Sequence, residues 1–344
     1  MEMNSYERVL TAMKLGQPDR VPIFETVIDP EVMRAISPDA RDVGELAELL
    51  DLDVVGCGPV FQRVSGDDHR WVDEWGVHYQ RNAEAMAHPV RGAIGCLEDL
   101  RTYRPPDPDA PGRLGKLPEF VSRYQGKRAI VFHHRAAFMW SCYLMGMENM
   151  LIALIEDPRL ADAVLDLVVD VNEQICRNAV RAGADIITLG DDYAMNTAPL
   201  FSPECFQRHI LPRLQRVIDA IHDEGGLVIK HSDGNLWPIL DAIVETGAEG
   251  LNPIEPSAGM DIIRVKDEYG NRVCLIGNID CGDLLCHGSI EEVEQAVRAC
   301  IGTAAPGGGF MLSSSNSIHS SVKPENYVAM VRTGQDCGRY PLSC

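Results

Sequence analysis

Short apolar runs bounded by turn residues recur along the chain, and this pattern is typical of strands. Most of the runs are continuously apolar instead of alternating, as in strands that are covered on both faces. Eight such runs predict strands at residues 20–25, 53–58, 129–134, 185–192, 227–233, 249–255, 274–280 and 310–316.

Segments with helical periodicity separate these runs. The clearest covers residues 202–225, where Ser202 can cap the helix, Gly225 can end it and Pro212 predicts a kink. Other helices are predicted at residues 31–50, 148–183, 235–247, 259–269, 289–304 and 323–334. Eight strands that alternate with helices favour an α/β fold, a (β/α)8 TIM barrel that forms one domain over residues 1–344.

One segment interrupts the alternation between the second and third predicted strands. Residues 59–128 contain a stretch of period-two character, "RWVDEWGVHYQR", and a proline-rich connection. We interpret them as an inserted hairpin excursion, a lid or substrate wall beside the barrel mouth. Its aromatic residues Trp71, Trp75 and Tyr79 are more typical of packing within the hairpin than of a ligand pocket.

Polar side chains gather at the carboxyl ends of the predicted strands, where barrel enzymes place their active sites. The segment "LVIKHSDGN" changes at His231 from a buried strand to polar residues. His231 and Asp233 lie two positions apart, so both can face the same metal ion or substrate oxygen. The alternative is that His231 pairs with a neighbouring carboxylate and Asp233 caps the next helix.

The neighbouring strand ends in Asp191 and Asp192, which face opposite ways on an extended chain. One of them is expected in the barrel and the other in a loop cap; with Asp192 inside, the predicted catalytic residues are His231, Asp233 and Asp192. Candidate substrate-binding residues at the other strand ends are Glu25, His134, Asn252, Glu255, Asn278, Asp280 and His319.

The charge balance narrows the class of partner. The chain has 31 basic and 51 acidic residues and a net charge of −20, which disfavours nucleic acids and anionic membrane surfaces. No apolar run is long enough to span a bilayer and no signal pattern is present, so a cytoplasmic location is expected. The eleven cysteines are too sparse for a disulfide scaffold and are expected to be reduced.

The sequence resembles the uroporphyrinogen decarboxylase superfamily over nearly its whole length. The resemblance rests on the following segments: "SYERVLTAMKLGQPDRVPIFE", "VDEWGV", "AGADIITLGDD", "SPECFQRHILPRLQRVIDAIHDEGGLVIKHSDGN", "TGAEGLNPIEP", and "GNRVCLIGNID" through "GGGFMLSSSNSIHSSVKPENYVAM". It implies a (β/α)8 barrel, in agreement with the strand count.

Differences between this chain and the motifs of each branch indicate which branch of the superfamily it resembles. Decarboxylases carry arginines after the first strand and an aspartate at the end of the second, whereas this chain has "FETVIDPEVMR" and "DVVGCGPVF" there. Corrinoid-dependent methyltransferases that act on thiols hold zinc with a His-x-Cys pair and a second Cys after the last strand. Here Asp233 replaces the first Cys and "SSSN" stands where the second would lie.

The "HSDGN" form is similar to the methyltransferase components of O-demethylases. This resemblance implies transfer of a methyl group from a methoxylated, aromatic small molecule to the cobalt of a corrinoid held by a partner carrier protein. His231 and Asp233 would bind zinc with Asp192 or, alternatively, position a proton. A uroporphyrinogen-type decarboxylase and a methylcorrinoid:thiol methyltransferase are the alternatives. The oligomeric state stays open, with a homodimer as one form.

Overall fold

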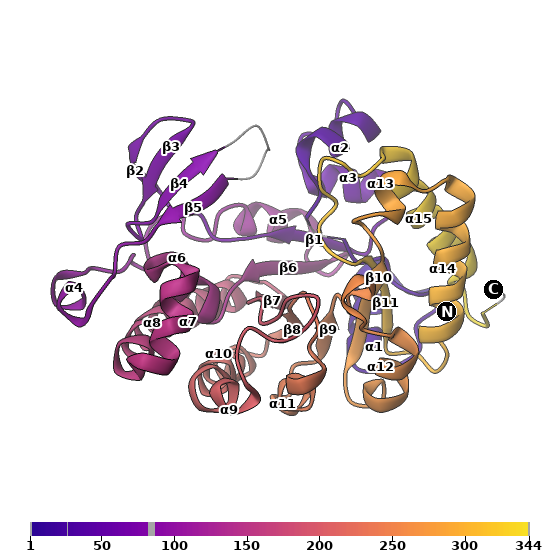
Figure 1. The fold of residues 1–344 in the computed structure, drawn as a ribbon. Coiled ribbons are helices and arrows are strands. Elements are labelled where there is room, and N and C mark those ends of the chain that lie inside the picture. The colour runs from indigo at the N-terminus through magenta and orange to yellow at the C-terminus, as the bar shows by residue number, and fades with distance from the viewer. Residues whose placement is uncertain (1, 26, 82–86, 343–344) are drawn as a thin grey trace.

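Seven parallel strands curl into a barrel in the order β1-β6-β7-β8-β9-β10-β11 (Figure 1). The computed structural model describes residues 2–25, 27–81 and 87–342. The strands are β1 Val54–Cys57, β6 Ala129–His134, β7 Ile186–Gly190, β8 Leu227–His231, β9 Gly250–Asn252, β10 Cys274–Ile279 and β11 Phe310–Ser314. Each matches a run that the apolar pattern predicts.

The remaining predicted strand, residues 20–25, lies between β11 and β1 and closes the barrel. Ile23 forms a parallel bridge with Leu312, and the Phe24 amide donates to the Leu312 carbonyl at 2.8 Å. On the other side the Asp53 amide donates to the Ile23 carbonyl at 3.1 Å. The segment is thus an irregular eighth strand, and the predicted barrel fold is confirmed.

A buried carboxylate, that of Asp53, holds the irregular strand against β1 at the amino end of the barrel. Asp53 is fully buried and accepts hydrogen bonds from Arg8 Nη1 at 2.6 Å and Arg20 Nη1 at 3.0 Å. It also accepts from the Ile23 amide at 2.8 Å. One side chain therefore joins the first helix, the irregular strand and β1.

The described chain also contains helices, most of which lie around the outside of the barrel (Figure 1). They are α1 Ser5–Met13, α2 Pro30–Ile36, α3 Val43–Leu50, α4 Leu97–Thr102, α5 Leu117–Tyr124, α6 Phe138–Met145, α7 Met147–Glu156, α8 Pro158–Arg181, α9 Pro203–Cys205, α10 Leu211–Asp223, α11 Leu240–Glu245, α12 Ile262–Tyr269, α13 Leu284–His287, α14 Ile290–Ala304 and α15 Pro324–Cys337. The helices predicted over 31–50 and 148–183 are each divided into two. A π-helical turn at Phe206–Ile210 interrupts the helix predicted over 202–225, immediately before the turn that contains Pro212.

The barrel interior is apolar at its amino end. Val9 and Met13 of α1 pack there against strand residues such as Val131 and Ile229, all of them buried. Helix α1 therefore closes this end as a plug. The polar strand ends are left at the opposite mouth.

The insert after β1 is a four-stranded antiparallel sheet and not a single hairpin. Its strands are β2 Arg63–Gly66, β3 Arg70–Asp73, β4 His78–Arg81 and β5 Ala87–Arg91. Residues 82–86 of the predicted excursion lie outside the described residues. Trp71 stacks on Tyr79 with ring centroids 5.5 Å apart, and buried Trp75 stacks on Trp140 of α6 at 4.9 Å. These aromatic residues pack the insert and dock it on the barrel.

Within the described residues, no helix by itself has the length and apolar character that a membrane crossing requires. Helices α6 and α7 meet that requirement only as a pair, and the pair is bent by 104°.

Candidate active site

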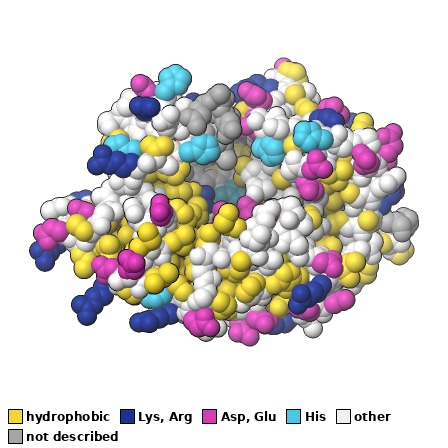
Figure 2. All heavy atoms as spheres, in the orientation of Figure 1, with side chains coloured by type: hydrophobic (Ala, Val, Ile, Leu, Met, Phe, Trp, Pro, Cys, Tyr) yellow, Lys and Arg dark blue, Asp and Glu magenta, His cyan; other side chains and the backbone are white. Residues whose placement is uncertain are grey.

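A cavity of about 530 Å³ opens at the carboxyl ends of the strands. Figure 2 shows the hollow on this face, with histidine side chains near its rim. Its lining combines strand-end residues with residues of the insert and of α6: Phe24, Glu25, Val27, Pro59, Phe61, His133, His134, Arg135, Trp140, Thr188, Gly190, Asp192, His231, Asp233, Asn252, Ser313, Asn316 and Ser317. The structure thus places one shared cavity where the polar strand ends were expected.

His231 ends β8, and its orientation is fixed by the neighbouring strand. Asn252, its register partner on β9, donates through Nδ2 to the Ile276 carbonyl at 3.1 Å. The Asn252 Oδ1 is therefore the acceptor of the 2.6 Å hydrogen bond to His231 Nδ1. In the neutral ring this leaves the Nε2 lone pair available on the cavity side, as in metal-binding histidines.

Asp233 lies two residues beyond and is held by a segment distant in sequence. Its Oδ2 accepts a 2.6 Å hydrogen bond from Asn316 Nδ2, whereas its buried Oδ1 has no hydrogen-bond partner in the described structure. Burial and the nearby carboxylates Asp192 and Glu255 raise the pKa of Asp233 to about 6, although His231 opposes the rise. The side chain can therefore carry a proton or donate an oxygen to a metal.

Asp191 and Asp192 are adjacent in sequence and serve different purposes. The fully buried Asp191 accepts hydrogen bonds from the amides of Ala137, Phe138 and Met139 at 2.8–3.2 Å, at the start of α6. Asp192 lines the cavity instead. The pair thus divides as the sequence suggested, into a loop cap and a side chain inside the barrel mouth.

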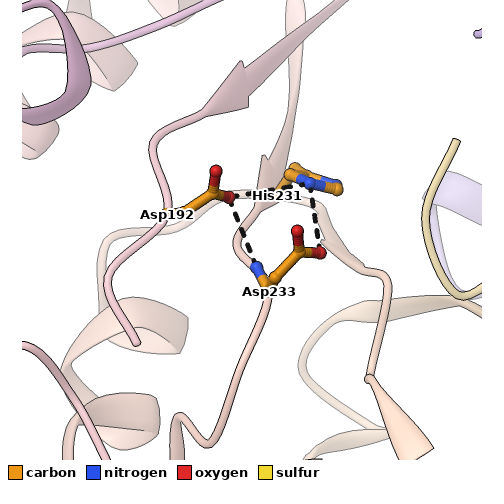
Figure 3. Close-up of side chains that lie close together, drawn as sticks. All are labelled: Asp192, His231 and Asp233. Atoms are coloured by element: carbon orange, nitrogen blue, oxygen red, sulfur yellow. Dashed lines mark hydrogen bonds and ion pairs between the residues drawn. The ribbon is translucent and has the colours of Figure 1, made fainter. Parts of the chain in front are cut away.

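Asp192, His231 and Asp233 converge in the cavity (Figure 3). His231 Nε2 lies 3.8 Å from Asp192 Oδ1 and 3.5 Å from Asp233 Oδ1, and one ligand atom from each residue lies within 4.8 Å of the others. The Oδ1 of Asp233, which accepts no hydrogen bond in the described structure, and the Nε2 of His231 fit a cation at this point. Two carboxylates and an imidazole are ligands that Zn²⁺ accepts, and they favour a harder centre than a thiolate site does.

Lys230 connects the two strand ends that carry the cluster. Its fully buried Nζ donates to the Asp191 carbonyl at 2.6 Å and to the carbonyl of His231, and it lies 4.1 Å from the Tyr193 ring centroid. Burial lowers the pKa of Lys230 to about 8. Lys230 thereby ties the end of β7 to the end of β8, which fixes the spacing of the two segments that carry the cluster.

The cavity walls offer further unsatisfied polar atoms. Besides Asp233 Oδ1, the buried atoms His133 Nε2, His134 Nε2 and Thr188 Oγ1 have no hydrogen-bond partner among the described residues. Burial lowers the pKa of His133 to about 4 and that of His134 to about 3, so both rings are neutral at pH 7. Buried polar atoms without partners are costly, so these atoms are suited to a polar ligand.

Six of the ten predicted site residues line the cavity: Glu25, His134, Asp192, His231, Asp233 and Asn252. Four do not: Glu255, Asn278, Asp280 and His319. Glu255 Oε2 accepts from the Gly234 amide at 2.8 Å, and Asn278 Nδ2 donates to the Ile254 carbonyl at 3.0 Å. Asp280 accepts from the Gly282 and Asp283 amides, and His319 Nε2 lies 3.1 Å from the Cys281 carbonyl. These four side chains shape loops at the mouth.

Several lining residues were not selected from the sequence. Phe61 comes from the insert and Trp140 from α6, and their rings pack edge to face with centroids 5.0 Å apart. Nothing in their local sequence signals a cavity, because the contact exists only after the insert docks. Asn316 is the last residue of a predicted strand, but its pairing with Asp233 across 83 positions has no local signal.

Comparison with known proteins gives consistent matches. The sequence model of the uroporphyrinogen decarboxylase (URO-D) family matches residues 76–336. Uroporphyrinogen decarboxylase of Syntrophotalea carbinolica is 25% identical over 263 residues, covering 74% of this chain and 72% of that protein. The methylcobamide:CoM methyltransferase MtbA of Methanosarcina acetivorans is 27% identical over 329 residues, covering 90% and 94%.

A solved structure supports the fold assignment. The structure described as a methyltransferase from Methanosarcina mazei superposes with a TM-score of 0.78 at 21% identity, covering 97% of this chain and 99% of that one. At this identity the likeness establishes the barrel architecture.

Proposed function

Because this chain belongs to the uroporphyrinogen decarboxylase (URO-D) family, we propose that it is a corrinoid-dependent methyltransferase. It moves the methyl group of a methoxylated aromatic compound to the cobalt of a corrinoid that a partner protein carries. The observation that carries this proposal is the cluster of Asp192, His231 and Asp233, which has oxygen and nitrogen donors only. No cysteine is among the described residues that line the cavity.

The donor set suits an ether oxygen better than a thiol. When cob(I)alamin attacks the methyl carbon, the carbon–oxygen bond breaks and its electron pair stays on the oxygen, which must take up a proton or be neutralised. Asp233 can hold that proton on Oδ1, because Oδ2 is occupied by the Asn316 amide. A single group that stabilises developing charge on oxygen is typically worth about 3 kcal/mol of barrier.

Asp192, His231 and Asp233 are also the residues that would hold zinc. When bound there, zinc would supply a Lewis acid for the ether oxygen. The Asn252 hydrogen bond orients the imidazole for either role, and Lys230 keeps the two strand ends at fixed separation. The rings of Phe24, Phe61 and Trp140 supply apolar walls that suit an aromatic ring and exclude water.

The relatives favour one alternative, methyl transfer from a methylcorrinoid to a thiol. The methylcobamide:CoM methyltransferase MtbA of Methanosarcina acetivorans aligns over 90% of this chain. The cavity lining argues against it, because a thiolate acceptor is usually activated by a soft, sulfur-rich centre. Decarboxylation of a polycarboxylate is disfavoured because Arg135 is the only Lys or Arg among the described lining residues, beside Glu25, Asp192 and Asp233.

An anaerobic substrate panel tests the proposal. Purified protein is mixed with cob(I)alamin, free and bound to a corrinoid carrier protein, and with a series of methoxybenzenes. Formation of methylcob(III)alamin is followed by its absorption spectrum, with His231→Ala as the inactive control. If no methoxylated compound methylates cobalt but methylcob(III)alamin is demethylated by coenzyme M, the thiol alternative replaces the proposal. Release of CO₂ from uroporphyrinogen would instead indicate a decarboxylase.

A further inference from the structure

Arg135 stands at the cavity edge, immediately after β6, and neutral groups hold it there. Its Nη1 donates to the Gly190 carbonyl, and its guanidinium carbon lies 5.6 Å from the Tyr143 ring centroid. The side chain is half-buried. A guanidinium group has five N–H donors in a rigid fork, and only one of them is engaged by these contacts.

No carboxylate in the described parts of the chain forms an ion pair with Arg135. Other arginines with little exposure do pair with acids: the buried Arg113 pairs with Glu74 at 2.6 Å, and the partly buried Arg213 pairs with Asp166 at 2.8 Å. Arg135 is also the only Lys or Arg among the described residues that line the cavity. A positive charge that is half-buried, facing a cavity and without an internal partner is suited to an anionic ligand.

The space beside Gly190 connects Arg135 with the catalytic cluster. A Cβ atom built on Gly190 would lie 3.9 Å from Arg135 Nη1 and 3.9 Å from His231 Cδ2, in ordinary van der Waals contact with both. Arg135 and His231 therefore lie beside the same small space, which is open because Gly190 has no side chain. Arg135, Gly190 and His231 all line the same cavity.

We propose that Arg135 binds a carboxylate of the substrate, so that the methyl donor is a methoxylated aromatic carboxylate. This inference rests on the proposed methyl transfer and names its substrate class. The carboxylate engages the guanidinium fork, while the methoxy oxygen faces His231 and Asp233. The carboxylates of Glu25 and Asp192 disfavour an anion elsewhere along the lining. The charge at Arg135 therefore sets the orientation of the ring.

Calorimetric binding to the purified protein tests this with 3-methoxybenzoate and its neutral analogue 3-methoxybenzamide. The wild type should bind the benzoate more tightly. Arg135→Gln should weaken benzoate binding roughly 10- to 100-fold, the usual range for a lost charge-assisted contact, and leave benzamide binding nearly unchanged. Arg104→Gln is the matched control, because Arg104 is exposed, its hydrogen bonds in the described structure go to backbone carbonyls, and it is not among the residues that line the cavity.

A second variant keeps the proposal testable if Arg135→Gln fails to fold. Gly190→Ala places a methyl group in the small space without a steric clash, since its nearest neighbours would be 3.7–3.9 Å away. It should keep the wild-type melting temperature and weaken benzoate binding at least tenfold. Unchanged benzoate affinity in Gly190→Ala, or equal losses for both ligands in Arg135→Gln, would overturn the assignment.

The binding experiment separates this inference from the proposed function, because it needs no corrinoid. Charge-selective binding that depends on Arg135 supports the carboxylate site whatever the outcome of the methyl-transfer assay. Methylation of cobalt by neutral methoxybenzene, in a protein with no preference for the benzoate, would overturn the role of Arg135 and leave the methyltransferase proposal standing.

Discussion

At the scale of single residues, the candidate site depends on small differences between neighbouring positions. Asp191 and Asp192 are adjacent, yet one accepts backbone amides and the other faces the cavity. Asp233 accepts a hydrogen bond through one oxygen and none through the other in the described structure. The chemistry proposed for the site therefore rests on which oxygen atom of a carboxylate is already engaged.

The raised pKa of Asp233 predicts opposite pH profiles for the two versions of the mechanism. If Asp233 donates a proton, its active form is lost as pH rises through about 6, and the rate of methyl transfer should fall about tenfold per pH unit above that value. If zinc is bound instead, protons compete with the metal, and zinc affinity should rise with pH through the same range. Stopped-flow rates between pH 5 and 8, with and without a chelator, distinguish them.

The Asn252 contact predicts a loss of metal affinity. Asn252→Leu removes the acceptor that fixes His231 Nδ1–H, so the ring loses its orientation, and zinc affinity should fall roughly 10- to 100-fold. Competition with a chromophoric chelator measures it. Asn149→Leu is the control, because that amide donates to the Met145 carbonyl and lies outside the cavity. Less than a tenth of an equivalent of zinc in active wild-type protein, with no effect of chelation, would leave only the proton-donor version.

At the scale of elements, strand ends were predictable and the directions of their side chains were not. Apolar runs that stop at a polar residue locate the mouth, which is why His231, Asp233 and Asn252 could be selected. Asp280 also follows a strand, but it accepts the amides of its own turn. His319 likewise lies against the Cys281 carbonyl. Such turns form through local hydrogen bonds that residue type alone does not reveal.

The cap on α6 predicts that Asp191 and Asp192 differ in their effect on stability. Asp191→Ala leaves three amides at the start of α6 without an acceptor, so the free energy of unfolding should fall by about 2–3 kcal/mol. Asp192→Ala should change it by less than about 1 kcal/mol, because its side chain lines the cavity, while methyl transfer is lost. Urea titration of both variants makes the comparison. Equal destabilisation by the two would contradict this division.

At the scale of the whole molecule, the barrel depends on contacts between segments far apart in sequence. The count of apolar runs predicted eight strands, but only the structure shows that residues 20–25 close the barrel through isolated bridges. Likewise, the insert became a four-stranded sheet whose Phe61 meets Trp140 of α6. Contacts of this kind depend on how elements dock, so no local pattern encodes them.

The carboxylate at the closure predicts a large global effect. Asp53→Leu leaves Arg8 and Arg20 as buried charges without their common partner, and the free energy of unfolding should fall by about 3–5 kcal/mol. Asp51→Asn is the control, since asparagine tolerates the left-handed backbone of Asp51 (φ 51°), the side chain is 64% exposed, and its pairing with Arg20 and Arg128 should contribute at most about 1 kcal/mol. A thermal unfolding midpoint equal for both variants would contradict a structural role for Asp53.

The bridge between Arg20 and Arg339 has a practical consequence. It holds both ends of the described chain near the amino end of the barrel, which α1 closes, opposite the open mouth. A biosensor surface that captures the protein by an affinity tag at either extremity would leave the mouth directed toward solution. A protein as large as a corrinoid carrier could then be tested for docking in that orientation.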